Sequence, residues 1–375
     1  MKDVRRIMED YLVQDPEIEY LDERAEISVP FDPNAIRIAT TPLNLGDILE
    51  RVEHDEIKLD TEFQRRFVWK LERQSQFIES LLLRLPVSTF YFDGGDDNKW
   101  RIIDGLQRIS TVKRFVLDQS LALTGMEFLK QFEGKCFGDL PRDLQRRIRT
   151  FPITAYIVEK GTPDEVKYNI FSRVNRGGLV LKAQEIRHAL FQERGASDFI
   201  RDLAEHPSFL TATSRKIQTE RMEDRDFVTR FVAFAVLGYQ SYQPDMDTFM
   251  TKGMEVLKGM PETGRQRLKS VFIASMECIF SIFGDDAFRK RTHPQDVRKP
   301  INKALFEVLS VQIAALSNEQ QAMLIGRGEQ LKARLMAHMQ SGQDFLRSIT
   351  VATAGRESVA IRHAKFQEML TEVLS

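Results

Sequence analysis

The period of the apolar residues changes near residue 160, and this change constrains the fold of the chain more than any other feature. Before residue 160, short runs of β-branched and aromatic residues alternate with stretches of helical period; after it, almost every apolar stretch has helical period. The first pattern predicts a compact α+β domain, and the second predicts an all-α helical domain. We therefore predict an acidic arm at residues 1–30, an α+β domain at 31–160 and a helical domain at 161–375.

The same patterns place the individual elements, and turn residues such as Gly238 and Gly284-Asp285 mark the breaks between them. In the first domain we predict strands at residues 56–59, 87–92, 99–103, 120–123 and 153–159. Helices are predicted there at 45–52, 71–84, 107–118 and 142–149. In the second domain helices are predicted at 163–175, 182–191, 197–205, 225–237, 265–283, 300–316, 319–340 and 357–374.

Charge is unevenly distributed along the chain. The net charge is −1, so any contact with nucleic acid has to come from a local basic patch. Residues 1–30 contain nine acidic and four basic side chains, which leaves +4 for the remainder. One such patch is predicted on the helix at 142–149, whose four arginines either contact a nucleic-acid backbone or form an ordinary solvated face.

Several functional classes lack their sequence signatures here. The two cysteines are far apart and the six histidines show no paired metal-ligand spacing, so we expect no zinc, haem or flavin. The P-loop and Gly-x-Ser-x-Gly patterns are absent, and His293-Pro294 followed by Asn302 is only a faint echo of a His-Asn-His nuclease module. No apolar run approaches the roughly 20 residues that span a bilayer. We therefore expect a cytoplasmic protein with no membrane contact.

The most informative short motif is Asp104-Gly105-Leu106-Gln107-Arg108. It lies between a strand-like run and a helix, so it is expected to form a strand-to-helix turn. Gly105 permits a tight backbone, and the helix start offers amide groups and a positive dipole end to an anion, beside an arginine suited to phosphate. Asp104 could cap the helix, bind Mg²⁺ that accompanies a nucleotide, or act as a general base. The alternative is an ordinary surface Asp-Gly turn.

A second polar segment, Gln64-Arg65-Arg66, stands between two phenylalanines and is followed by Trp69. Two adjacent arginines are costly to bury without partners, so they form either an anion clamp or a solvated turn. Trp69 is either a core residue or a stacking surface for a base.

Two further pairs of polar residues lie near the predicted domain boundary. Arg173 and Asn175 converge only if Asn175 has left its helix, which the following Gly177-Gly178 makes plausible. Glu185 and Arg187 either belong to the site or form a structural ion pair that joins the two domains, and we favour the ion pair. All four are expected to face the first domain.

These segments, in this order and spacing, resemble the ParB/sulfiredoxin-like superfamily, and within it the N-terminal domain of GmrSD-type modification-dependent restriction systems. That family reads Gln-Arg-x-x-x-Trp, then Asp-Gly-Gln-Gln-Arg, Phe-x-Arg-x-Asn and Glu-x-Arg. The likeness runs from about residue 36 to residue 187. Leu106 replaces the first Gln of the second motif, so one polar contact is expected to be missing.

The resemblance implies a nucleoside-triphosphate-binding domain with slow hydrolysis, in a bacterial defence system where the nucleotide state gates a nuclease or partner on a separate chain. It assigns catalysis to Asp104, Gln107 and Arg108, with Mg²⁺ bound through Asp104. It assigns nucleotide or phosphate contacts to Gln64, Arg65, Arg66, Trp69, Gly105, Thr111, Arg173 and Asn175. We expect Arg108 to contribute little to fold stability, in contrast to Leu81 on the apolar face of a core helix.

Two other functions stay open. One is a DNA-binding or DNA-nicking protein in which the same arginines hold a phosphodiester. The other is a catalytically silent scaffold or antitoxin-like module, which Leu106 makes conceivable.

Overall fold

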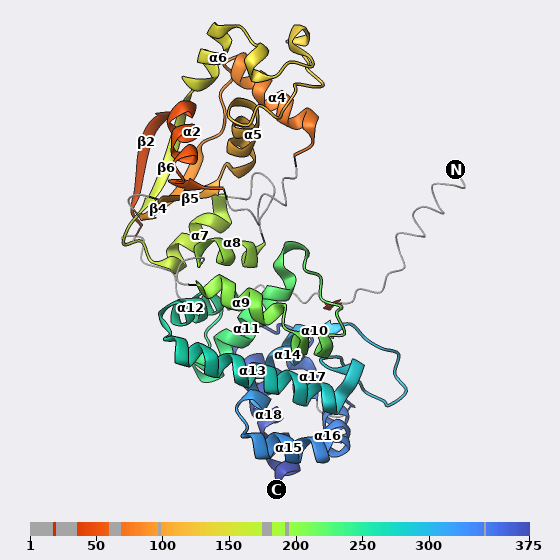
Figure 1. Ribbon diagram of the computed structural model, residues 1–375. Helices are drawn as coiled ribbons and strands as arrows, with labels where there is room; N and C mark the ends of the chain where they lie inside the picture. Colours follow the sequence, from red (N-terminus) through yellow and green to blue (C-terminus); the bar gives the residue numbers. More distant parts are fainter. Residues whose placement is uncertain are drawn as a thin grey trace, which may run out of the picture. The chain divides into compact units, whose positions relative to one another are not determined.

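The computed structural model describes residues 18–19, 36–59, 69–96, 99–174, 182–191, 195–340 and 343–375. The chain divides into two compact units, one of residues 31–181 and the other of residues 1–30 with 182–375. The first is mixed α+β and the second is mainly helical, as the sequence predicts (Figure 1). The division falls after residue 181 and not near 160. The reason is that α7 (Asp164–Val174) contacts strand β5 (Lys99–Asp104), and its Lys167 binds Asp93 at 2.7 Å.

The α+β unit is built on a mixed five-stranded sheet with the order β2-β6-β4-β5-β3. Its other strands are β2 (Ile38–Asn44), β3 (Ile57–Lys58), β4 (Phe90–Asp96) and β6 (Pro152–Glu159). The pairs β2–β6 and β4–β5 are antiparallel, whereas β4–β6 and β3–β5 are parallel. The strands predicted at 56–59, 99–103 and 153–159 are confirmed, and the one predicted at 87–92 begins at Phe90 and runs on to Asp96.

Two strand predictions differ from the structure. Residues 120–123 form no strand, because Leu121 and Leu123 are buried within an irregular segment whose backbone bonds to residues 134 and 135. Strand β2 is absent from the prediction. It is an edge strand with Pro42 in its middle and weak hydrophobic alternation, so its sequence gives little sign of a sheet.

Four helices cover one face of this sheet, as Figure 1 shows. They are α2 (Leu45–Glu53), α4 (Leu71–Leu82), α5 (Leu106–Val116) and α6 (Arg142–Arg149), each within a few residues of its prediction. Helix α2 begins where Asn44 and Asp47 cap each other's backbone amides. The apolar sides of the four helices pack with Phe90 and Phe92 of the sheet to form one core, in which Leu81 is fully buried as expected.

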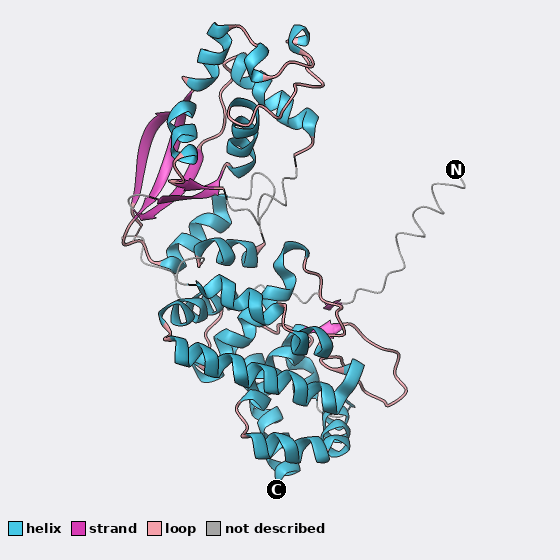
Figure 2. Ribbon diagram, in the orientation of Figure 1, coloured by secondary structure: helices cyan, strands magenta, loops and turns pink. Residues whose placement is uncertain are grey.

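The second unit is helical, apart from one short two-stranded sheet (Figure 2). Its helices are α8 (Ala183–Leu190), α9 (Ala196–Ala204), α10 (Pro207–Ala212), α11 (Glu223–Leu237), α12 (Met246–Gly259), α13 (Glu262–Phe283), α14 (Lys303–Ala314), α15 (Asn318–Gly326), α16 (Gly328–Gln340), α17 (Gln343–Ser348) and α18 (Arg356–Leu374). Short 3₁₀ helices lie at Lys130–Phe132 and Phe137–Asp139 in the first unit, and at Glu220–Met222, Tyr239–Ser241 and Gly284–Asp286 in the second.

Most of the predicted helices of this unit are confirmed, with three additions and one division. Helices α10, α12 and α17 were not predicted, and the single helix predicted at 319–340 is α15 and α16. Helix α12 is missing from the prediction although its buried apolar residues recur at helical spacing, at Met246, Phe249, Met250, Met254 and Leu257. At Gly253, an added Cβ would lie 2.7 Å from the Cβ of Ala233, so a glycine is needed for close packing inside this helix. Among the described residues, no helix is long and apolar enough to cross a membrane.

Part of the acidic N-terminal arm is paired with the helical unit. Strand β1 (Ile18–Glu19) runs parallel to β7 (Ile301–Asn302), and Ile18 is buried. Asn302 is also fully buried, where its side chain accepts from the amide of Leu305 at the start of α14 and donates to Glu19. Asn302 is therefore a helix-capping residue and not part of a nuclease cluster. The rest of the arm lies outside the described residues.

A buried ionic cluster joins α11, α14 and α18 within the helical unit. Arg362 donates from Nε and Nη2 to the two carboxylate oxygens of Glu307 at 2.7 and 2.8 Å, and both side chains are fully buried. Arg230 adds a longer bond of 3.4 Å, and His363 Nε2 lies 3.2 Å from the carboxylate. Burial alone would raise the pKa of Glu307, but Arg362 and the other donors lower it below the ordinary value.

We expect this cluster to make the helical unit acid-sensitive. Because the pKa of Glu307 is lowered on folding, its stabilising effect is complete above the ordinary Glu pKa of about 4.3 and is lost as the pH falls below it. The substitution Glu307→Gln removes the carboxylate that buried Arg362 binds through two hydrogen bonds, so it should destabilise the fold by about 3–5 kcal/mol at pH 7. It should also weaken the dependence of the melting temperature on pH below about 5.

Melting curves recorded between about pH 3 and pH 7 would measure both effects. The exposed Glu329, which pairs with Lys332, provides the matched control Glu329→Gln, and this variant should behave as wild type. A Glu307→Gln protein with the wild-type pH dependence would contradict the assigned role of the carboxylate.

Candidate functional site

Asp104-Gly105-Leu106-Gln107-Arg108 forms the turn between β5 and α5, as the sequence predicts. Gly105 is the N-cap residue of α5. Its φ is 107°, a backbone angle that residues other than glycine rarely adopt. The ring of Phe90 also lies against it, since an added Cβ would be 2.5 Å from Phe90 Cδ1. Both the backbone angle and the close contact therefore require glycine at this position.

The Asp104 carboxylate turns toward the side of α5 and does not cap its first turn. Oδ2 accepts from Arg108 Nη2 at 2.5 Å, and the N-cap residue Gly105 makes no side-chain hydrogen bond. Of the three roles considered for Asp104, helix capping is therefore not the one observed. The first turn of α5 contains no acidic residue, so no helix carboxylate neutralises the positive end of its dipole. The Asp104 side chain remains one-third exposed.

Arg108 is buried, in contrast to the expectation that it adds little to stability. Its side chain is only 9 % exposed, and its guanidinium carbon lies 4.2 Å from the centre of the Phe90 ring. Nη1 donates to the carbonyl and hydroxyl of Ser88, and Nη2 donates to the carbonyl of Thr89 at 3.0 Å as well as to Asp104. Burial lowers the pKa of the guanidinium and Asp104 partly offsets this, but the group stays charged at neutral pH.

Gln107 joins the turn to the start of α4. Its Oε1 accepts from the backbone amide of Trp69 at 3.3 Å, across 38 positions of sequence. Gln74 Nε2 donates to the Trp69 carbonyl at 2.8 Å, so both backbone groups of Trp69 are held. The two motifs that the resemblance associates are therefore adjacent at this point. Gln64, Arg65 and Arg66 of the first motif lie outside the described residues.

The ring of Trp69 packs edge-on against Phe77, with ring centroids 5.7 Å apart, and remains partly exposed. The guanidinium of Arg73 lies 4.8 Å from the centre of the same ring, and Arg73 is exposed. Sequence reasoning missed Arg73 as a candidate cation. Its spacing of four residues from Trp69, across the start of a predicted helix, is the signal that could have identified it.

The other predicted site residues occupy different surroundings. Thr111 is fully buried, and its hydroxyl donates to the Gln107 carbonyl at 2.7 Å, inside the helix. Arg173 is exposed at the end of α7, and Asn175 lies outside the described residues. We therefore leave Thr111 out of the proposed site.

Glu185 and Arg187 have partners within the helical unit. Glu185 accepts from Arg221 at 2.8 Å and from the amide of Lys182 at 2.7 Å. Arg187 is fully buried and donates to Asp226 at 3.0 Å and to Asp247 at 2.9 Å. Both side chains thus help to hold α8 in its own unit, and their role in joining the two domains stays a prediction.

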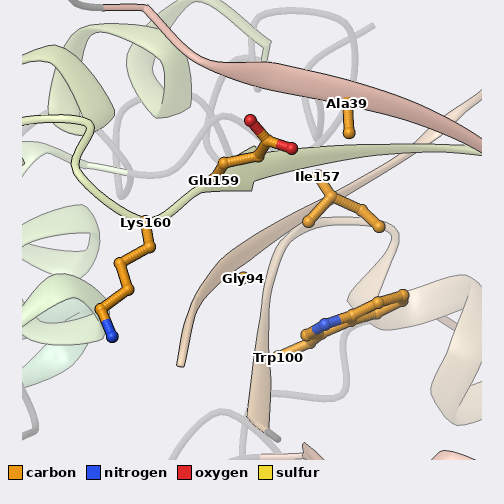
Figure 3. A pocket seen from close by; sticks show the side chains of 6 residues that line it. All are labelled: Ala39, Gly94, Trp100, Ile157, Glu159 and Lys160. Atoms are coloured by element: carbon orange, nitrogen blue, oxygen red, sulfur yellow. The ribbon is translucent and has the colours of Figure 1, made fainter. Parts of the chain in front are cut away.

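A hollow of about 380 Å³ lies beside Trp100, near the start of β5 (Figure 3). Its lining residues are Ala39, Gly94, Trp100, Ile157, Glu159 and Lys160. The guanidinium of Arg51 lies 4.1 Å from the centre of the Trp100 ring, which helps to fix that wall. Since Trp100 and Asp104 stand near opposite ends of β5, this hollow is separate from the turn and contains none of the predicted site residues.

We expect Arg108→Ala to lower the free energy of unfolding by about 2–4 kcal/mol, because it removes a buried cation and the donors of several hydrogen bonds. Lys113→Ala is a matched control on the same helix. Its partly exposed pair with Asp118 should be worth less than about 1 kcal/mol. Urea unfolding followed by circular dichroism would measure both losses. Equal and small losses would show that the Arg108 contacts do not stabilise the turn.

Comparison with protein families identifies the α+β unit. Residues 45–192 match the family described as GmrSD restriction endonuclease, N-terminal domain. The comparisons with curated proteins and with solved structures give no match. The matched span contains the β5–α5 turn and its contact with Trp69. Residues 45–192 of this chain therefore belong to the GmrSD restriction endonuclease N-terminal domain family, which implies a component of a restriction-type defence system.

Proposed function

We propose that the chain binds a nucleoside triphosphate at the β5–α5 turn and hydrolyses it slowly. The nucleotide state then gates a nuclease or other partner, on a separate chain, in the defence system. This proposal is supported by the pairing of a helix start that has no acidic residue in its first turn with a partly exposed carboxylate. The N-cap residue of α5 is Gly105, which has no side chain, and the Asp104 carboxylate is bound to Arg108. Phosphate groups are well suited to such a helix start.

The proposal needs positive charge beyond Arg108, because that guanidinium is buried and paired with Asp104. Among the described residues, Arg73 supplies an exposed positive charge beside Trp69. Arg65 and Arg66 stand four and three residues before Trp69 in the sequence, and the family resemblance assigns them to phosphate. We propose that these three arginines neutralise the phosphate chain, while Arg108 acts as a positioning residue for Asp104.

Mg²⁺ fits this site as an ion that accompanies the nucleotide. The described residues contain no cluster of three or more acidic, histidine or cysteine side chains that could hold a metal ion. A single carboxylate together with phosphate oxygens is a common way for proteins to bind Mg²⁺. We assign this contact to Asp104, whose Oδ2 is already fixed by Arg108. When bound, Mg²⁺ neutralises charge that develops on the phosphate oxygens. Gln107 is proposed to orient the attacking water.

Thermal-shift measurements with ATP, GTP, CTP and UTP in the presence of Mg²⁺ would test the proposal. At least one nucleotide should raise the wild-type melting temperature, because a ligand that binds the folded state stabilises it. Asp104→Asn keeps the shape of the side chain but removes its charge, so it should lose the Mg²⁺-dependent part of the shift. Asp118→Asn, just beyond the far end of α5, is the matched control. No shift with any nucleotide at millimolar concentration would contradict the proposal.

DNA binding is a second candidate, and helix α6 favours it. Arg142, Arg146 and Arg149 follow a spacing of four and three residues, so they form one stripe along the helix, and all three are exposed. Arg147, in contrast, donates to the Leu82 carbonyl at 2.8 Å. If the stripe contacts a phosphate backbone, replacing its three arginines by glutamine should weaken DNA binding. It should also make the plot of log affinity against log salt concentration less steep, by the contribution of about three phosphate contacts. An unchanged salt dependence would exclude this role.

A further inference from the structure

Two hydrogen bonds hold the backbone of Trp69 between helices α4 and α5. Gln107 of α5 accepts from its amide, and Gln74 of α4 donates to its carbonyl at 2.8 Å. The Gln74 side chain is buried, and its Oε1 accepts from Nη1 of Arg114 at 3.0 Å. Gln107 and Arg114 are seven residues apart on α5, so they lie on one face of that helix. Helix α5 therefore reaches the Trp69 backbone twice, directly through Gln107 and indirectly through Gln74.

A glutamine suits this buried position because its amide has one end of each kind. Its Nε2 only donates and its Oε1 only accepts. The Trp69 carbonyl needs a donor and the Arg114 guanidinium needs an acceptor, so the two contacts fix which way the amide faces. Because one of the donors is charged, the contact with Arg114 is stronger than a bond between two neutral groups. Arg114 thus holds the side chain that holds Trp69.

A second glutamine makes the same local contact at the start of α6. Gln145 Nε2 donates to the carbonyl of Leu140, five residues earlier, and its Oε1 accepts from Arg142 at 3.3 Å. The two sites differ in the source of the arginine. Arg142 belongs to the same helix as Gln145, whereas Arg114 comes from the neighbouring helix α5. Gln74 therefore does more than close the start of its own helix, because it joins that start to the helix of the candidate site.

We infer that Gln74, held by Arg114, is a positioning residue of the nucleotide site, an inference that rests on the proposed function. The ring of Trp69 has the Arg73 guanidinium over it, 4.8 Å from its centre. A shift of the Trp69 backbone would therefore move the ring and this exposed cation relative to the start of α5. Gln74 touches no ligand. It keeps the Trp69 backbone against Gln107, so that Arg73 and the first turn of α5 contact the same phosphate chain.

Calorimetry with two matched variants tests this inference. The probe is the nucleoside triphosphate that gives the largest thermal shift, together with Mg²⁺. Gln74→Met keeps the length of the side chain and adds no charge, but it cannot donate and accepts only weakly. Gln145→Met removes the equivalent bonds at the start of α6. Both variants should lower the midpoint of urea unfolding, but only Gln74→Met should weaken nucleotide binding, by about ten-fold, which corresponds to one hydrogen bond.

The fluorescence of Trp69 gives a readout that a general loss of stability would not change. The chain has two tryptophans, so Trp100→Phe leaves Trp69 as the single fluorescent indole. In that background, Gln74→Met should shift the emission of the folded protein to longer wavelength, because the ring is held less firmly against Phe77. Gln145→Met should leave the emission unchanged.

Arg114→Met should weaken nucleotide binding in the wild-type protein and add little to the loss in Gln74→Met, because Arg114 acts through Gln74. Losses that add in full would overturn the role of Arg114.

Three outcomes would overturn the inference alone: wild-type nucleotide affinity in Gln74→Met, equal weakening in Gln74→Met and Gln145→Met, or unchanged Trp69 emission in Gln74→Met. The first would show that the site does not need Gln74, the second that any loosened helix start weakens binding, and the third that Gln74 does not hold Trp69. Failure of the wild-type protein to bind any of the four nucleotides would instead overturn the proposed function, and this inference with it.

Discussion

Arg108 connects three stretches of the α+β unit through one buried guanidinium group. It donates to the carbonyls of Ser88 and Thr89 just before β4, lies over the ring of Phe90, and holds the Asp104 carboxylate at the end of β5. The candidate site depends on these contacts, because they draw Asp104 away from the first turn of α5. Without Arg108, that carboxylate would be free to cap the helix and to fill the position that an anion would otherwise occupy.

The same pairing sets the electrostatics of the turn. A buried arginine and a partly exposed aspartate nearly neutralise each other, so the turn offers oriented amides and one carboxylate and little net positive charge. A polyanion would need additional cations there, either a metal ion or other arginines. The helical unit uses buried arginines differently. Arg362 and Glu307 bind each other fully out of solvent, where the pair fixes the packing of helices and has no exposed atoms for a ligand.

Much of the fold could be predicted from sequence, because it depends on local patterns. The apolar period located α2, α4, α5 and α6, and Gly105 between a strand and a helix identified the turn. The errors arose where packing overrides the local signal. Edge strand β2 is stabilised by its partner β6 more than by its own residues.

The site was predicted only in part, for a related reason. The family resemblance assigned Asp104, Gln107 and Trp69 to one site, and the structure shows a hydrogen bond between Gln107 and Trp69. It could not show that Arg108 is buried, because an arginine that binds phosphate and one that binds carbonyl oxygens look alike in a sequence. It also missed Arg73, whose proximity to Trp69 depends on a ring contact.

Hydrogen exchange measured by mass spectrometry, with and without a saturating Mg²⁺–nucleotide complex, tests most directly whether the β5–α5 turn binds nucleotide. Amides that bind a ligand exchange more slowly, so protection is expected in peptides that cover residues 105–109 and 69–74. The fold around Leu81 should exchange at the same rate in both states. Protection confined to the hollow beside Trp100, or to the helical unit, would contradict the assignment of the nucleotide site to this turn.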